Sequence, residues 1–157
     1  MLLSLLSLLL HCATRLINPQ HFDAAYMRQV LQQRLAQQRP NAPLRVDSTC
    51  LAASTHHARY LSATRTIGHY EDVPCAVPLR YDIEQRHVDG EICLTYRAYS
   101  DYYQLSYEQL ADKMVANWLA SPDHRDVLLT KQLVRFGASV VYNSQDDTYY
   151  AVVNFRY

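Results

Sequence analysis

The chain has 157 residues, a length that fits one domain. Its 49% hydrophobic and 19% charged residues are a globular composition, and 15 basic against 15 acidic residues leave no net charge that would attract nucleic acid. Its three glycines exclude the glycine-rich phosphate loops, and the H-E-x-x-H, G-x-S-x-G and C-x-x-C motifs do not occur. The commonest signatures of metalloproteases, serine hydrolases and thiol redox enzymes are therefore missing.

An apolar run of leucines and serines occupies residues 2–10. It is shorter than the ~20 residues that a membrane-spanning helix needs, and it has the length of a signal-peptide core. We therefore expect a leader over residues 1–17 and a single domain over residues 18–157. We expect the protein to be secreted or to lie in the periplasm or cell envelope. A retained apolar N-terminal helix is the alternative.

The predicted elements begin with helices and end with a hairpin. Apolar residues at helical spacing predict helices over residues 18–39, 48–64 and 106–121, and a short helix follows Pro122. Asp47 or Ser48 is the expected N-cap of the second helix. Alternating residues predict strands over 91–97, 136–142 and 149–155, and residues 68–90 are expected to be mainly loop. This order predicts an α+β fold, with a small antiparallel sheet covered by helices.

The four cysteines have no zinc-knuckle spacing. Cys75 and Cys93 bracket a polar stretch, and a disulfide between them would remove loop entropy worth ~3 kcal/mol from the unfolded chain. Cys12 and Cys50 are the remaining pair, which requires that the leader be retained. If the leader is removed, we expect Cys50 to be a buried thiol.

Three polar residues lie at the ends of predicted elements. His69 follows the second helix, Glu91 begins the first strand and His124 lies in the short helix. Side chains at element ends can converge on one cleft, and two imidazoles with a carboxylate can bind Zn²⁺ with an open position for water. Capping, ion pairing or exposure to solvent is the alternative for each. His56 and His57 lie inside the second helix, where we expect packing or hydrogen bonding rather than metal ligation.

Four stretches of the sequence together resemble a known family. They are residues 31–44, the helix of residues 51–61 followed by His69, the Gly90-Glu91-Ile92 triplet, and residues 118–128. The last stretch is similar to the W-x-x-S-P-x-H-R signature of bacterial members of the CAP superfamily. This superfamily includes cysteine-rich secretory proteins, antigen 5 and plant pathogenesis-related proteins. The resemblance covers about residues 23–157 and is closest to the short bacterial SCP-like members.

The resemblance implies an α-β-α sandwich with a central cleft. In the family, this cleft commonly holds two histidines and two glutamates, and some members bind zinc through the histidines. On this chain the histidines would be His69 and His124, and the first glutamate would be Glu91. Ser121 stands at the position of the second glutamate, and Ile92 replaces the asparagine of the family's Gly-Glu-Asn motif.

Three residues around the last motif have structural interpretations. Trp118 continues an apolar helical stripe, so we expect it in the core. Ser121 is expected to cap the short helix that follows. Arg125 is expected to cap a helix end or to form an ion pair.

Three functions remain open at this point, because a fold does not determine a function. The first is an exported binding module that holds a lipid, a sterol or a protein partner in the cleft or beside it. The second is a metal-assisted hydrolase or peptidase, with Glu91 as general base and a metal on His69 and His124. The third is a structural interaction protein with a vestigial cleft. No nucleic-acid partner and no membrane-spanning segment are expected.

Overall fold

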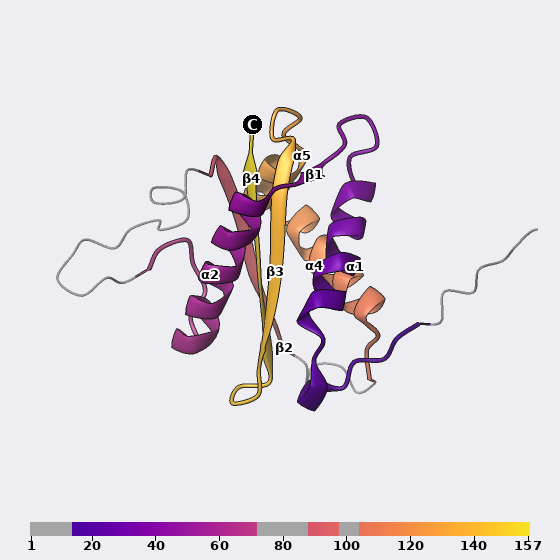
Figure 1. Ribbon diagram of the computed structural model, residues 1–157, viewed down its shortest axis with the longest axis vertical. Helices are drawn as coiled ribbons and strands as arrows, with labels where there is room; N and C mark the ends of the chain where they lie inside the picture. The colour runs from indigo at the N-terminus through magenta and orange to yellow at the C-terminus, as the bar shows by residue number, and fades with distance from the viewer. Residues whose placement is uncertain (1–13, 72–87, 98–103) are drawn as a thin grey trace, which may run out of the picture.

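The protein is a sandwich of helices on both faces of one sheet (Figure 1). The computed structural model describes residues 14–71, 88–97 and 104–157. Its helical segments are η1 (Pro19–His21), α1 (Ala24–Gln37), α2 (Ser48–Thr64), α4 (Tyr107–Ala120) and α5 (Pro122–Leu129). Its strands are β1 (Arg45–Val46), β2 (Gly90–Arg97), β3 (Arg135–Asn143) and β4 (Thr148–Arg156). The predicted α+β class and α-β-α architecture are therefore confirmed.

The strands are arranged in the order β1-β3-β4-β2. β4 pairs antiparallel with both β2 and β3, while β1 adds a short parallel pairing in which Val46 lies beside Phe136. Strand β1 was not predicted, because two residues are too few to show an alternating pattern. Within the described part of the chain, β2 forms one edge of the sheet.

Helix boundaries follow their capping residues. The first helix starts later than predicted, because Pro19–His21 form a separate 3-10 turn. Asp23 then caps α1 by accepting a hydrogen bond from the N–H of Tyr26. Asp47 caps α2 in the same way through the N–H of Cys50 at 2.9 Å, which confirms one of the two predicted caps.

The two faces of the sheet pack against different helices. Helices α1 and α4 cover one face and α2 covers the other (Figure 1). On the central strand β4, Val153 and Phe155 belong to the large apolar core on the α1–α4 side, whereas Val152 packs with Ala58 and Leu61 of α2. Successive side chains of a strand point to opposite faces, so the core alternates along the chain with a period of two.

The same alternation places the polar residues of β2. Ile92 and Leu94 belong to the core on the α1–α4 side, while Cys93 packs with residues of α2. Glu91 is two residues from Cys93 and therefore shares its face. The carboxylate of Glu91 thus lies on the α2 side of the sheet.

Helix α2 approaches β3 closely at Gly137. A Cβ atom on this residue would lie 2.1 Å from the backbone nitrogen of Leu51, so no other residue fits without moving the helix. The hydroxyl of Ser54 donates to the carbonyl oxygen of Gly137 at 2.7 Å. These two contacts set the distance between α2 and the sheet.

Several predictions on the chain ends and cysteines involve residues outside the described ranges. Residues 1–13 of the predicted leader are among them, so the domain boundary after residue 17 stays a prediction. Ile17, the last residue of that predicted leader, is buried in the core. No disulfide occurs among the described residues, and the pairings Cys75–Cys93 and Cys12–Cys50 each include one cysteine outside them. No helix in the described ranges has the length and hydropathy to cross a membrane.

Candidate functional site

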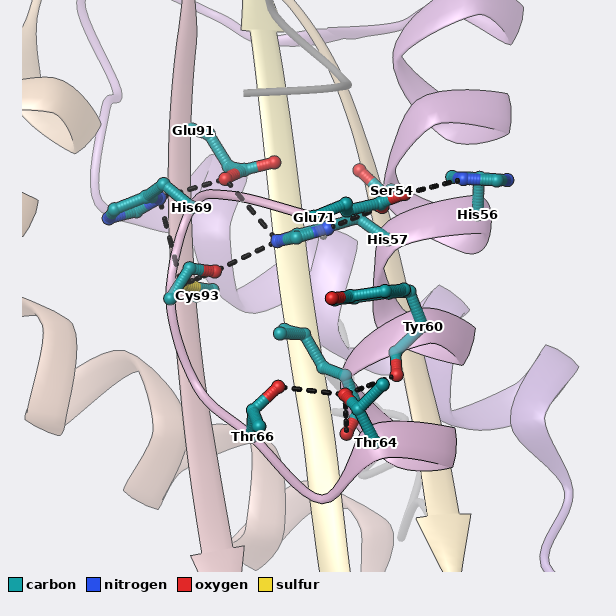
Figure 2. A network of polar contacts seen from close by, with 12 residues as sticks. Ser54, His56, His57, Tyr60, Thr64, Thr66, His69, Glu71, Glu91 and Cys93 are labelled. Carbon is teal, nitrogen blue, oxygen red and sulfur yellow. Dashed lines mark hydrogen bonds and ion pairs between the residues drawn. The ribbon is translucent and has the colours of Figure 1, made fainter. Parts of the chain in front are cut away.

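The site is built on the segment that follows α2 and on the edge strand β2 (Figure 2). Arg65 ends α2 in the left-handed conformation, with φ of 54°, and its N–H bonds to the carbonyl of Leu61. The chain then passes along the sheet and brings Nδ1 of His69 to 2.8 Å from Oε1 of Glu91. The Glu91 side chain is buried, whereas that of His69 is 32% exposed. The pair therefore joins a buried carboxylate to a ring that reaches solvent.

His124 approaches the same ring from the other helical layer. It lies on α5, and the ring centroids of His69 and His124 are 6.2 Å apart in an edge-to-face arrangement. Burial, together with the neighbouring His69, lowers the pKa of His124 from its usual value. His124 is therefore a neutral imidazole at neutral pH. The structure thus brings together the three residues singled out from the sequence, with His69 between the other two.

His57 lies behind this site in a fully buried position. Its Nδ1 is 2.8 Å from Oε1 of Glu71, and its Nε2 is 2.8 Å from the carbonyl oxygen of Gly68. A carbonyl oxygen only accepts, so Nε2 carries a hydrogen. The contact with Glu71 needs a second proton, either on Nδ1 or on the carboxyl group. His57 therefore links α2 to the segment that carries His69, and its expected hydrogen-bonding role is confirmed.

Glu71 is a buried residue of this network that the sequence did not single out. It is hydrogen-bonded to both His57 and His56, the latter at 3.0 Å. Its only sequence signal was a lone carboxylate two residues after His69, in a segment expected to be loop. A burial pattern would not have revealed it, because the segment has no regular period.

Asn154 and Ser54 complete the surroundings of Glu91. In the orientation that satisfies both ends of its amide, Asn154 donates to Oε2 of Glu91 at 3.3 Å and accepts from the backbone N–H of Ser54 at 3.2 Å. The other carboxylate oxygen, Oε1, already accepts from His69. Both oxygens of Glu91 are thus engaged by hydrogen-bond donors, which orient the carboxylate.

The two described cysteines have different environments. Burial and the nearby Asp47 raise the pKa of the Cys50 thiol to about 12, so this thiol is unreactive. Cys93 lies beside the site: its Sγ is 3.5 Å from the carbonyl oxygen of Gly68 and 3.7 Å from Nδ1 of His69. From the sequence, Cys93 was expected only as a disulfide partner.

The other residues of the W-x-x-S-P-x-H-R motif have different environments. Trp118 is 0% exposed, in the core where we expected it. Ser121 occupies the predicted N-cap position of α5, but its side chain makes no capping hydrogen bond. Pro122 at the first turn has no N–H to satisfy, and Asp123 complements the positive helix end. Arg125 is exposed and forms no ion pair with another described residue, unlike the prediction.

Comparisons with known proteins agree with this architecture. The family model of the cysteine-rich secretory protein family, CAP, matches residues 25–155, and the chain therefore belongs to this family. No curated protein matches the sequence.

Three bacterial structures share the fold. An outer surface protein from Borrelia burgdorferi has a TM-score of 0.62 at 17% identity, over 86% of this chain and 96% of that one. An extracellular protein containing an SCP domain from Bacillus anthracis has a TM-score of 0.58 at 19% identity, over 85% of this chain and 41% of that one. A cysteine-rich secretory protein from Staphylococcus aureus has a TM-score of 0.54 at 13% identity, over 86% of this chain and 40% of that one. This chain thus spans less than half of the last two.

Proposed function

We propose that the chain is an exported binding module whose polar centre is the pair His69 and His124 at the edge of β2. The observation that carries this proposal is the 2.8 Å contact between Nδ1 of His69 and the buried carboxylate of Glu91. An ionised carboxylate only accepts, so Nδ1 carries the hydrogen and Nε2 keeps its lone pair. Glu91 therefore orients a partly exposed imidazole that can accept a hydrogen bond or ligate a metal.

A protein partner is favoured over a lipid or sterol. A cavity of about 780 Å³ beside α2 has a mixed lining, in which Arg28 and Arg59 lie with apolar residues such as Leu51. It also contains His56 and Glu71, which belong to the polar network behind the site. This mixture of charged, polar and apolar groups is typical of a protein–protein interface, whereas an acyl chain or sterol ring needs a predominantly apolar pocket.

Export is supported by two independent features. The apolar run at residues 2–10 has the length of a signal-peptide core. Two of the similar structures are described as an outer surface protein and as an extracellular protein. We therefore assign the module to the cell envelope or the medium.

The metal-assisted hydrolase is the second candidate. Its support is the neutral His124 beside His69, because two neutral imidazoles are ligands that Zn²⁺ accepts, and a bound Zn²⁺ supplies Lewis-acid chemistry. Glu91 is less suited to act as its general base. Both carboxylate oxygens already accept hydrogen bonds from His69 and Asn154, and the group is buried.

Imidazole ¹⁵N NMR and partner capture test the proposal. We expect His69 to carry its hydrogen on Nδ1 at neutral pH and to lose this preference in Glu91→Leu, which removes the acceptor. Immobilised wild-type protein should retain a specific envelope protein that His69→Ala/His124→Ala does not retain and that the exposed Arg125→Ala still retains. Hydrolysis of an unstructured protein substrate that requires Zn²⁺ and disappears in Glu91→Gln would instead establish the hydrolase.

A further inference from the structure

Three potential metal ligands from two segments meet on the α2 side of β2. They are Nδ1 of His69, a carboxylate oxygen of Glu91 and Sγ of Cys93, and these atoms all lie within 4.8 Å of one another. Nδ1 is 2.8 Å from Oε1 of Glu91 and 3.7 Å from Sγ (Figure 2). Glu91 and Cys93 are buried, whereas His69 is partly exposed. The cluster therefore has a protected interior and one ring that opens toward solvent.

We propose that these three side chains form a binding site for Zn²⁺ or a chemically similar divalent cation, with Cys93 as a ligand. An imidazole, a carboxylate and a thiolate together suit Zn²⁺, whereas Ca²⁺ and Mg²⁺ prefer oxygen ligands alone. The site differs from a metal held between His69 and His124, because His124 does not contribute to it. The proposal deepens the proposed function through His69 and Glu91, but it does not depend on the partner.

The spacing of the ligand atoms fits such an ion. Bonds of about 2.0 Å to nitrogen and oxygen and about 2.3 Å to sulfur place tetrahedral ligands about 3.3–3.6 Å apart. The Nδ1 to Sγ distance of 3.7 Å already has this value, within a few tenths of an ångström. The Nδ1 to Oε1 distance of 2.8 Å is that of a hydrogen bond, so it must widen by about half an ångström when the ion replaces the proton between these atoms.

The groups around the cluster hold its ligands in place. His57 donates from Nε2 to the carbonyl of Gly68, which fixes the segment that carries His69. The Cys93 thiol donates to the same carbonyl at 3.5 Å, and it loses this contact together with its proton when the thiolate binds the ion. The amide of Asn154 bonds to Oε2 of Glu91 and leaves Oε1 toward His69. Such outer partners orient the ligands of a metal site and tune their affinity. Neutrality also favours the ion, because Glu91 and a Cys93 thiolate together offset its two positive charges.

The experiment is Co²⁺ titration of the full chain under reducing conditions, followed by competition with Zn²⁺. We expect one Co²⁺ per chain with a thiolate-to-cobalt charge-transfer absorption, which Zn²⁺ displaces. Cys93→Ser should abolish this absorption and weaken Zn²⁺ binding by more than the roughly 10–100-fold that loss of an outer partner costs. Cys50→Ser, which changes the other described cysteine, should leave the absorption and the Zn²⁺ affinity unchanged. His124→Ala should also leave them unchanged.

The outcomes separate this proposal from the proposed function. Absence of the charge-transfer absorption, or Zn²⁺ binding that survives Cys93→Ser but is lost in His124→Ala, overturns the Cys93 site. A disulfide between Cys93 and Cys75 in the exported protein, found by peptide mass mapping, overturns it too. If Cys93→Ser does not fold, Cys93→Ala with a wild-type thermal transition replaces it. Loss of the partner in His69→Ala/His124→Ala bears only on the binding module.

Discussion

The face of the sheet covered by α1 and α4 is packed by large apolar side chains, whereas the face covered by α2 is packed by small side chains and a buried polar network. Trp118, Leu110 and Leu35 are among the fully buried residues of the first face. On the second face, the buried residues of α2 include Ala53, Ser54 and His57. The first face therefore buries apolar surface area, whereas the second face positions hydrogen-bonding groups.

This difference explains why the candidate site is on the α2 side. Apolar packing stabilises by about 25 cal/mol per Å² but does not orient polar atoms. A buried hydrogen bond contributes little net free energy, yet leaving one of its partners unsatisfied is costly, so a complete network holds a single arrangement. His57, Glu71 and Glu91 therefore fix His69, while the opposite face supplies most of the stability.

The largest effect is expected from breaking the contact between α2 and the sheet. Gly137→Ala should lower the free energy of unfolding by about 4 kcal/mol, above the usual ~1–3 kcal/mol of overpacking. Its Cβ would meet the backbone of Leu51 at 2.1 Å, and a helix backbone cannot yield as a side chain can. Urea unfolding followed by circular dichroism measures this.

Gly90→Ala is the matched control for that substitution. A Cβ at Gly90 would lie 3.1 Å and 3.2 Å from the side-chain carbons of Val127 and Leu133, which can move. We expect a loss of about 1 kcal/mol. Equal losses at the two glycines would contradict the requirement for close backbone approach at Gly137.

Truncation on the apolar face should affect stability without affecting the network. Leu110→Ala should cost about 3 kcal/mol, because it removes a fully buried side chain and leaves a cavity in the large apolar core. The ¹⁵N signals of His57 and His69 should remain those of the wild type. A shift of these signals would show that the two faces are coupled through the sheet.

Removal of one network partner should cost less than removal of a core side chain. His57→Leu should lower the free energy of unfolding by about 2 kcal/mol, because Glu71 loses one buried donor but keeps His56. Glu71→Leu should have a similar cost, and the double variant should cost less than the sum. Fully additive losses in the double-mutant cycle would argue against a direct His57–Glu71 interaction.

The smallest effect is expected at the N-terminus of α2. The N–H of Cys50 lowers the pKa of Asp47 below its value of 3.8 in the unfolded chain. A lowered folded-state pKa contributes stability that is present above pH 3.8 and is lost as the pH falls through the folded value. Asp47→Ala should cost about 1 kcal/mol at pH 7.

Asp47→Asn separates the cap from its charge. Asparagine caps helices nearly as well as aspartate, so stability at pH 7 should change little. Asparagine does not titrate, so the part of the acid-induced decrease in stability that comes from protonation of Asp47 should be absent in this variant. An unchanged acid profile in Asp47→Asn would show that other carboxyl groups account for it.

Much of the fold followed from local patterns in the sequence. The second and third helices, the Asp47 cap, the core position of Trp118 and the strands of the terminal hairpin all depend on residues a few positions apart. The resemblance carried by the W-x-x-S-P-x-H-R motif named the same family that the family model matches. Strand β1 escaped prediction because its parallel pairing with β3 depends on contacts across the sheet.

The sequence by itself determined the α+β class, the apolar stripes and which histidines lie at element ends, because periodicity and capping are properties of neighbouring residues. The family resemblance implied one cleft for His69 and Glu91, but only the tertiary structure decided that their side chains are in direct contact, with Cys93 beside them. It also decided that Glu71 is buried between two histidines. These contacts arise where α2, the segment after it and β2 pack together, and no local pattern encodes a contact between segments so far apart.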